Sequence, residues 1–281
     1  MRNLGLLAFH LMSGLSGNNM AQRSNIEWTD YSWNPVTGCS KVSEGCRHCY
    51  AERMAKRLKA MGNARYADGF NVTLQDDLVD LPRRLRKPRI IFVNSMSDLF
   101  HDAILDEHIG KIAKVMSDVR RHTYQVLTKR SVRMKDLLNG DLRDCAACKH
   151  IWWGVSAENR EYGLPRMDVL RETNCQNRFV SIEPLLSDIG KLNLDGIHWV
   201  IVGGESGPKA RPMKQEWVVS IRDQCKQANV PFFFKQWGGV HKKQTGRLLD
   251  GVEWNERPIR MQWGYTEDSY GPLATNKERR S

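Results

Sequence analysis

The sequence predicts an α/β fold, a partial TIM-like barrel built from six or seven β/α units. Three observations predict it: short apolar runs recur along the chain, helical patterns fill the gaps between them, and each run ends in polar residues. Apolar runs that are rich in β-branched and aromatic residues and bounded by polar turns are typical of buried parallel strands. Strands that alternate with helices form β/α barrels, whose active sites are built at the carboxyl ends of the strands.

Seven strands are expected in chain order. The first lies near Ser32 to Val36, and six further runs follow at residues 89–94, 123–128, 151–156, 178–183, 198–203 and 230–235. Helical patterns such as 106–121 and 215–228 separate the runs. We therefore expect the barrel to occupy residues 20–239. The basic and aromatic residues 240–281 are expected to form a C-terminal extension.

The first 19 residues are treated separately. They carry one arginine and an apolar stretch that resembles the core of a signal peptide, but the charge and cleavage signals are poor. Met20 is a more natural start, so residues 1–19 are expected to be a disordered extension or to precede the true start. No segment approaches the roughly 20 apolar residues that span a bilayer, which predicts a cytoplasmic protein with no membrane partner.

The charge balance favours a polyanionic partner. Lys and Arg number 43 against 32 for Asp and Glu, a formal net charge of +11. An excess of this size is typical of proteins that bind nucleic acid, although a solvated basic face explains it as well.

Three cysteines near the start of the chain carry the most specific chemical signal. Cys46 and Cys49 are joined by a tight Cys-x-x-Cys turn, Cys39 precedes them by a longer loop, and Tyr50 and a helix-forming run follow at once. Three thiolates can hold a 4Fe–4S cluster by three irons and leave the fourth open, whereas electron-transfer clusters and structural zinc sites usually have four protein ligands. The missing fourth ligand therefore predicts a cluster with an open coordination position.

Three other interpretations of the cysteines are a zinc site, a disulfide framework and inert thiols. A zinc site would need another ligand nearby, and His48 would have to fold back on its neighbours to supply it. A disulfide framework fits poorly, because seven cysteines are an odd number in a chain large enough to bury a core unaided. Buried, inert thiols are the interpretation for Cys175 and Cys225, and we also favour it over a second metal site at Cys145 and Cys148.

Polar residues at the strand ends are the other candidates for a site. They are Ser97, Asp98, Lys129, Arg130, Ser156, Glu158, Glu183, Gly203, Gly204, Glu205 and Lys235. Some of them can simply cap helices, as Ser and Asp often do. Glu183 and Glu205 are harder to explain in this way, because a carboxylate that directly follows an apolar strand needs a partner.

In its cysteine motif and its alternating strands and helices, the chain resembles the radical S-adenosylmethionine (SAM) superfamily, which implies the partial barrel of that superfamily. The superfamily's usual spacing is Cys-x3-Cys-x2-Cys, whereas here six residues lie in the first gap. More closely, segments 28–30, 33–39, 45–51, 95–100, 127–130 and 203–207 are similar to a phage and prophage family of three-cysteine-motif proteins.

The resemblance implies two cofactors and a set of roles. Cys39, Cys46 and Cys49 would bind a 4Fe–4S cluster, and SAM would dock on its open iron. Ser97 and Asp98 would hold the SAM amino group, and Ser156 and Glu158 the ribose. Glu183, or Gly203, Gly204 and Glu205, would meet the remaining polar edges. Tyr50 would pack over the cluster, and an electron donor such as flavodoxin or ferredoxin would be a partner.

The resemblance also implies a DNA substrate. The phage family is associated with thymine hypermodification, including a radical isomerisation that converts N-linked glycinyl-thymidine to the C-linked form. Lys129, Arg130 and Lys235, with Glu183, form the predicted catalytic set, since cations can receive a substrate carboxylate or a phosphate. Two alternatives stay open: a radical SAM enzyme acting on damaged DNA, transfer RNA or a peptide, and a non-catalytic, metal-stabilised nucleic-acid binder.

Overall fold

One sheet of mainly parallel strands organises the chain. The computed structural model describes residues 22–24 and 26–262. Its main sheet has the order β1-β2-β5-β6-β7-β8-β9-β10, and every pairing from β2 to β10 is parallel. The strands are β1 (Gln22–Arg23), β2 (Tyr31–Trp33), β5 (Ile90–Val93), β6 (Thr123–Thr128), β7 (Ile151–Ser156), β8 (Asn177–Ile182), β9 (Trp199–Gly203) and β10 (Phe232–Gln236). Sequential order with parallel pairing is the topology of a β/α barrel.

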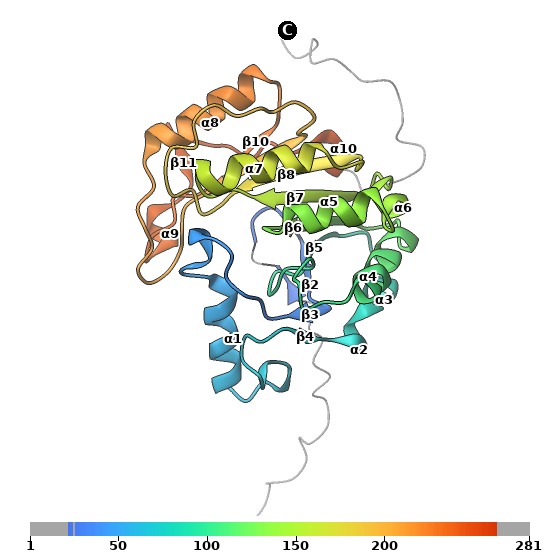
Figure 1. Ribbon diagram of the computed structural model, residues 1–281. Helices are drawn as coiled ribbons and strands as arrows, with labels where there is room; N and C mark the ends of the chain where they lie inside the picture. Colours follow the sequence, from blue (N-terminus) through green and yellow to red (C-terminus); the bar gives the residue numbers. More distant parts are fainter. Residues whose placement is uncertain (1–21, 25, 263–281) are drawn as a thin grey trace, which may run out of the picture.

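Helices cover one face of this sheet. Figure 1 shows α5 and α7 lying side by side over the middle strands, while α1 projects away from the sheet. The α-helices are α1 (Tyr50–Ala60), α2 (Asp76–Val79), α3 (Leu81–Arg84), α4 (Asp106–Asp118), α5 (Ser131–Asn139), α6 (Arg143–Ala146), α7 (Arg160–Arg171), α8 (Gln215–Gln227), α9 (Lys242–Thr245) and α10 (Ile259–Gln262). Two small pairs, β3 (Val36–Thr37) with β4 (Thr73–Leu74) and β11 (Leu248–Leu249) with β12 (Val252–Glu253), lie apart from the main sheet. No helix in the described ranges is long and apolar enough to cross a bilayer.

The sheet curls into a half-barrel. The Trp28 ring lies 4.8 Å from that of Phe92 on β5 and 6.2 Å from that of Trp199 on β9. In a flat sheet, strands about 4.8 Å apart would put β5 and β9 roughly 19 Å from one another, since three strands lie between them. One indole can contact both only because the sheet bends round it.

Alternate residues on the strands therefore serve two cores. One set, which includes Val126, Trp153 and Val200, packs against the helices through residues such as Ile112 and Leu170. The other set lines the concave face and is strongly aromatic: it contains Trp28, Phe92, Trp152, Phe179, Trp199, Ile201, Phe233 and Met261. An aromatic cluster thus fills the concave face around Trp28, and Glu183 and Lys235 lie toward the carboxyl ends of β8 and β10.

The predicted partial barrel is confirmed, and β6 and β7 begin and end where the sequence predicts. The first strand is shorter than expected because Asn34 and Pro35 follow Trp33, and proline cannot donate a hydrogen bond to a sheet. The helix predicted to reach residue 121 ends at Asp118. Beyond it, the Arg121 guanidinium donates to the backbone carbonyls of Pro82 and Leu85, which fixes the chain outside the helix.

The described part of the predicted C-terminal extension packs on the last strand. Phe233 of β10 pairs with Asn255 in an isolated antiparallel bridge, and the Trp199 indole donates to the carbonyl of Glu256 at 2.9 Å. Met261 reaches the aromatic core of the concave face. Residues 240–262 thus cover the open edge of the half-barrel, while the predicted extension 1–19 and residues 263–281 lie outside the described residues.

Candidate active site

The three cysteines lie on a loop at the carboxyl end of the sheet. Cys39 follows β3, Cys46 ends a short 3-10 helix, and Cys49 caps α1. We call residues 39–49 the cysteine loop. Its start is fixed at Gly38, where φ is +85° and a side chain would meet the backbone oxygen of Asn71 at 2.0 Å. The Gly38 amide also donates to the carbonyl of Met96, which holds the loop against the segment that follows β5.

All three thiols are free and half-buried. Burial, and next the negative charge of Asp98, raise the pKa of Cys39 to about 11, although Arg130 opposes the shift. Burial also raises the pKa of Cys49, against backbone hydrogen bonds from Glu52 and Ala51 at the start of α1. A metal deprotonates a coordinating thiol outright, so pKa values of this kind describe thiols before they bind one.

Three groups of side chains that follow strand ends bind the cysteine loop, and we call them its anchors. The first anchor is Arg130, which follows β6. Its guanidinium donates to Cys39 Sγ at 3.6 Å and to Ser40 Oγ at 2.9 Å. Asp98, after β5, accepts from the same guanidinium at 3.2 Å. The Asp98 carboxylate also accepts from Thr128 Oγ1 at 2.7 Å and from two backbone amides, so its position is fixed on several sides.

The second anchor is Glu158, which follows β7 and is completely buried. Its carboxylate accepts from Ser43 of the cysteine loop at 2.8 Å. Lys129 and Arg166 each lie 2.7 Å from the same carboxylate. Burial alone would raise the pKa of Glu158, but these two cations outweigh it and hold the pKa below its usual value. A side chain at Gly45 would meet Glu158 at 2.4 Å, so the loop lies directly on this residue.

The third anchor is Glu205, which follows β9. The carboxylate binds the Arg211 guanidinium at 2.7 Å, and Arg211 in turn donates to the carbonyl of Glu44 in the cysteine loop at 3.0 Å. Burial opposes ionisation of Glu205, yet the hydrogen bonds from Arg211 lower its pKa. Arg53 of α1 donates to the carbonyl of Ser206 at 2.7 Å, which ties the helix after the loop to the same strand end.

Glu183 and Lys235 form a separate pair on the concave face. Lys235 Nζ lies 2.8 Å and 3.0 Å from the two carboxylate oxygens of Glu183, and Gln236 donates to the same carboxylate at 3.3 Å. The Lys235 side chain is 14% exposed and the Glu183 side chain 21%, so the pair is largely buried but still reached by solvent. The carboxylates of Asp98, Glu158 and Glu205, in contrast, bind side chains that belong to the cysteine loop or contact it.

Gly203 and Gly204 keep the end of β9 free of side chains for two different reasons. A side chain at Gly203 would meet the carboxyl carbon of Glu183 at 3.2 Å, which leaves room for the Glu183–Lys235 pair. At Gly204 it would meet the backbone oxygen of Trp237 at 2.0 Å. Both glycines therefore serve close packing at the mouth.

Gly204→Ala is expected to destabilise the protein by about 1 to 3 kcal/mol, because the Trp237 backbone cannot move aside as a flexible side chain could. Gly110→Ala in the middle of α4 is the matched control, since nothing lies within 4 Å of its new methyl group. That control should stabilise the protein by up to about 1 kcal/mol, since alanine favours helix over glycine. Urea unfolding of both variants checks the opposite signs, and equal effects would refute the close approach.

The other predicted cofactor residues have varied surroundings. Ser97 Oγ donates to the carbonyl of Val36 at 2.8 Å, which also helps to seat β3. Ser156 is buried, and Tyr50 at the start of α1 is 61% exposed. Their predicted contacts with SAM and a cluster stay predictions.

The remaining cysteines have partners within the fold. The Cys145 thiol donates to the carbonyl of Ala113, and Cys175 lies 3.0 Å from Thr173 Oγ1. Burial raises the pKa of Cys145 and Cys225 to about 12. Buried thiols of this kind are inert. Within residues 22–24 and 26–262, no three His, Cys, Asp or Glu side chains converge closely enough to hold a single metal ion.

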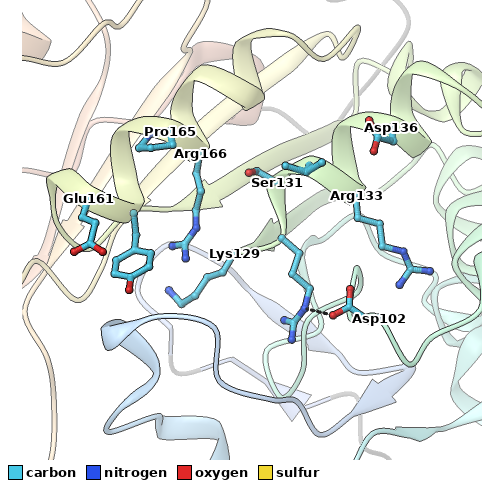
Figure 2. A pocket seen from close by; sticks show the side chains of 11 residues that line it. Asp102, Lys129, Ser131, Arg133, Asp136, Glu161, Pro165 and Arg166 are labelled. Carbon is cyan, nitrogen blue, oxygen red and sulfur yellow. Dashed lines mark ion pairs between the residues drawn. The ribbon is translucent and has the colours of Figure 1, made fainter.

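A pocket of about 540 Å³ opens between α5 and α7, beside the second anchor. Figure 2 shows Lys129 and Arg166 extending into the same region from the end of β6 and from α7. The cations that line it are already paired: Lys129 and Arg166 with Glu158, Arg130 with Asp98, and Arg133 with Asp106. The pocket thus lies beside the anchors, and all four of these cations already have a carboxylate partner.

Sequence reasoning placed most of the polar residues at the mouth but missed their partners. Ser43, Arg166 and Arg211 complete the anchors, and none belongs to a motif. Arg166 lies in the middle of an amphipathic helix, where an arginine is ordinarily solvated. For the third anchor, the sequence offers one indication: Arg211 lies only six residues after Glu205, close enough to pair with it.

Comparison with known proteins identifies the family. The model of a family described as a protein of unknown function, DUF5131, matches residues 23–258. The chain belongs to the DUF5131 family. No curated protein matches this DUF5131 chain.

Solved structures of spore photoproduct lyase are similar to the DUF5131 chain. The lyase complexed with dinucleoside spore photoproduct has a TM-score of 0.44 and 10% identity, and the match covers 76% of this chain and 66% of the lyase. A double mutant with bound AdoMet and the same dinucleoside has a TM-score of 0.43 and 10% identity, over 74% and 64% of the two chains. The DUF5131 chain therefore spans about two thirds of the length of these lyases. With TM-scores below 0.5, the likeness leaves its activity open.

Proposed function

We propose that this protein is a radical SAM enzyme that carries a 4Fe–4S cluster on Cys39, Cys46 and Cys49. The observation that carries the proposal is the position of the cysteine loop. Three cysteines lie across the carboxyl ends of a curled parallel sheet, and residues after β5, β6, β7 and β9 hold the loop there. A loop fixed from so many strand ends keeps its ligands in one arrangement, as a reactive centre requires.

The residues fit a cluster by their chemistry. The donor set is three thiols, the ligands that iron–sulfur clusters use, and each cysteine binds a different iron, so the thiolates need not converge on one point. Hydrogen bonds reach Cys39 from Arg130 and Cys49 from the first turn of α1. Such donors stabilise negative charge on cluster sulfur.

When bound, the cluster and SAM supply a radical that removes a hydrogen atom from substrate. The chain provides the enclosure: an aromatic cluster fills the concave face around Trp28, and Glu183 and Lys235 lie toward the carboxyl ends of β8 and β10. A paired ammonium and carboxylate can receive a zwitterionic or charged substrate group, because each charge then exchanges one partner of opposite charge for another.

The substrate proposed is a nucleic acid, most specifically a modified thymine in phage DNA. The net charge of +11 supports a polyanionic partner. The specific reaction proposed is isomerisation of glycinyl-thymidine from the N-linked to the C-linked form. A duplex would have to present this base outside its stack for the enclosed site to reach it.

Anaerobic reconstitution with iron and sulfide, followed by dithionite and SAM, tests the proposal. We expect a loaded cluster and formation of 5′-deoxyadenosine above background. A sample that loads zinc instead, or that holds a full cluster and yields no 5′-deoxyadenosine, would support a non-catalytic binder and overturn the proposal.

Lys235→Met separates substrate binding from cofactor chemistry. The variant should load the cluster and form 5′-deoxyadenosine, because Lys235 contacts Glu183 and not the cysteine loop. Turnover of single-stranded DNA that carries glycinyl-thymidine should fall at least tenfold, about 1.4 kcal/mol of lost interaction. Lys111→Met on the exposed face of α4 is the matched control. Unchanged product formation by Lys235→Met would remove this pair from the substrate site.

A further inference from the structure

The Arg130 guanidinium holds an unusual position beside the cysteine loop. Its side chain is only 7% exposed, although it carries a permanent charge. The same guanidinium reaches the sulfur of Cys39, the hydroxyl of Ser40 and the carboxylate of Asp98. A buried cation is costly, so a site that retains one is expected to use the charge.

We infer that Arg130 is a positioning residue that raises the reduction potential of the cluster through its hydrogen bond to Cys39. The inference rests on the proposed function, because it assumes that the cluster occupies the three cysteines. It differs from the sequence-based prediction, in which Arg130 contacts a substrate carboxylate or phosphate.

The direction of the effect follows from charge. Reduction adds one electron, and with it one negative charge, to the cluster and its thiolates. A cation that donates to a ligand sulfur stabilises the reduced form more than the oxidised form, because the interaction grows with the added charge. The buried position strengthens the effect, since little water lies between Arg130 and Cys39 to screen it.

The surroundings hold Arg130 in place for this contact. Asp98 receives the guanidinium on one side, and Thr128 and the amides of Phe100 and Lys129 fix the carboxylate. On the other side, Ser40 Oγ accepts from Arg130 and lies 2.8 Å from Nε2 of His101. The guanidinium therefore cannot turn away from Cys39 without breaking bonds to both Asp98 and Ser40.

Neither of the other two cysteines has such a partner among the described residues. Cys49 receives backbone hydrogen bonds from the start of α1, and Lys129 acts on it only through its charge. Cys46 lies 3.9 Å from the hydroxyl of Ser43. Among the described residues, Arg130 is thus the side-chain cation that donates to a ligand sulfur, and its removal should change the potential.

The test measures the midpoint potential of the reconstituted holoenzyme by anaerobic titration followed by electron paramagnetic resonance. Arg130→Gln should load iron and sulfide as the wild type does, and its midpoint potential should be more negative. Arg133→Gln is the matched control, since Arg133 also lines the pocket and binds Asp106 and backbone carbonyls but no sulfur. Its potential should equal that of the wild type.

Asp98→Asn is a second test, in which the midpoint potential is expected to shift in the opposite direction. It removes a negative charge beside Cys39 and keeps the arginine, so its potential should become more positive. If Arg130→Gln fails to load the cluster, a potential in Asp98→Asn that is unchanged or more negative overturns the inference. Loaded Arg130→Gln with the wild-type potential overturns it directly. A wild type that loads no cluster overturns the proposed function instead, so the two failures are distinguishable.

Discussion

Cys46→Ala is expected to abolish loading of the iron–sulfur cluster and, with it, all formation of 5′-deoxyadenosine. Cys46 is the middle ligand of the three, and it lies between Ser43, which binds Glu158, and the start of α1. The two thiolates that remain could hold only two irons of the cluster, and no other cysteine lies in the cysteine loop. Iron and sulfide content after anaerobic reconstitution, with the visible absorption spectrum, measures the loss.

Cys148→Ser is the matched control for this experiment. Cys148 is also a half-buried free thiol, and it likewise belongs to a Cys-x-x-Cys sequence, with Cys145. Its thiol donates to the carbonyl of Asp144 and has no contact with the cysteine loop. Cluster loading should therefore be unchanged. A Cys46→Ala protein with normal iron content, or a Cys148→Ser protein without iron, would contradict the assignment of the three ligands.

The strands were predictable from the sequence because they are buried on both faces. Trp152 faces the aromatic core of the concave side, and the adjacent Trp153 faces the helices, so neither face of β7 has a polar pattern. Burial on both faces requires the continuous apolar runs that mark parallel strands. Parallel strands in turn bring their carboxyl ends to one edge, so side chains that follow different strands lie together there.

The partners within the site were not predictable, because tertiary contacts decide them. Asp98 and Glu158 look alike in the sequence: each is a carboxylate shortly after an apolar strand. Their partners, however, come from other elements, Arg130 from the end of β6 and Arg166 from the second turn of α7. No local pattern tells a carboxylate that anchors a loop from one, such as Glu183, that is open to the mouth of the half-barrel.

The contacts of the C-terminal extension could not be predicted from its composition. A basic and aromatic composition suits a nucleic-acid surface and an edge cover equally well. In the structure, Trp254 packs at the edge of the core, and the Arg257 guanidinium donates to the carbonyl of Glu27. These contacts join the described part of the extension to the half-barrel.

Glu158→Gln is expected to destabilise the protein by about 3 to 5 kcal/mol, the cost of breaking a buried ion pair by removing one partner. Glu158 is completely buried, and it neutralises Lys129 and Arg166, whose side chains are 18% and 9% exposed. The neutral amide would leave both cations without an opposite charge. The effect should also reach the cysteine loop, because Ser43 donates to the same carboxylate. Urea unfolding of wild type and variant measures the change in the free energy of unfolding.

The pH dependence of the same interaction has a definite sign. The Lys129 and Arg166 cations outweigh burial and hold the pKa of Glu158 below its unfolded value of 4.5. A carboxylate whose pKa is lowered by folding stabilises the protein above the unfolded pKa, and this stabilisation is lost as the pH falls through the folded pKa. The difference in stability between wild type and Glu158→Gln should therefore be full at neutral pH and shrink below about pH 4.5.

Glu216→Gln is the matched control, because Glu216 is 71% exposed and lies 3.4 Å from the exposed Lys214. An exposed pair of this kind contributes less than about 1 kcal/mol. The double variant Glu158→Gln with Lys129→Met provides the sharper test, since it removes one of the two uncompensated cations and should recover part of the lost stability. Equal losses in Glu158→Gln and Glu216→Gln, or no recovery in the double variant, would show that Glu158 does not anchor the loop through its charge.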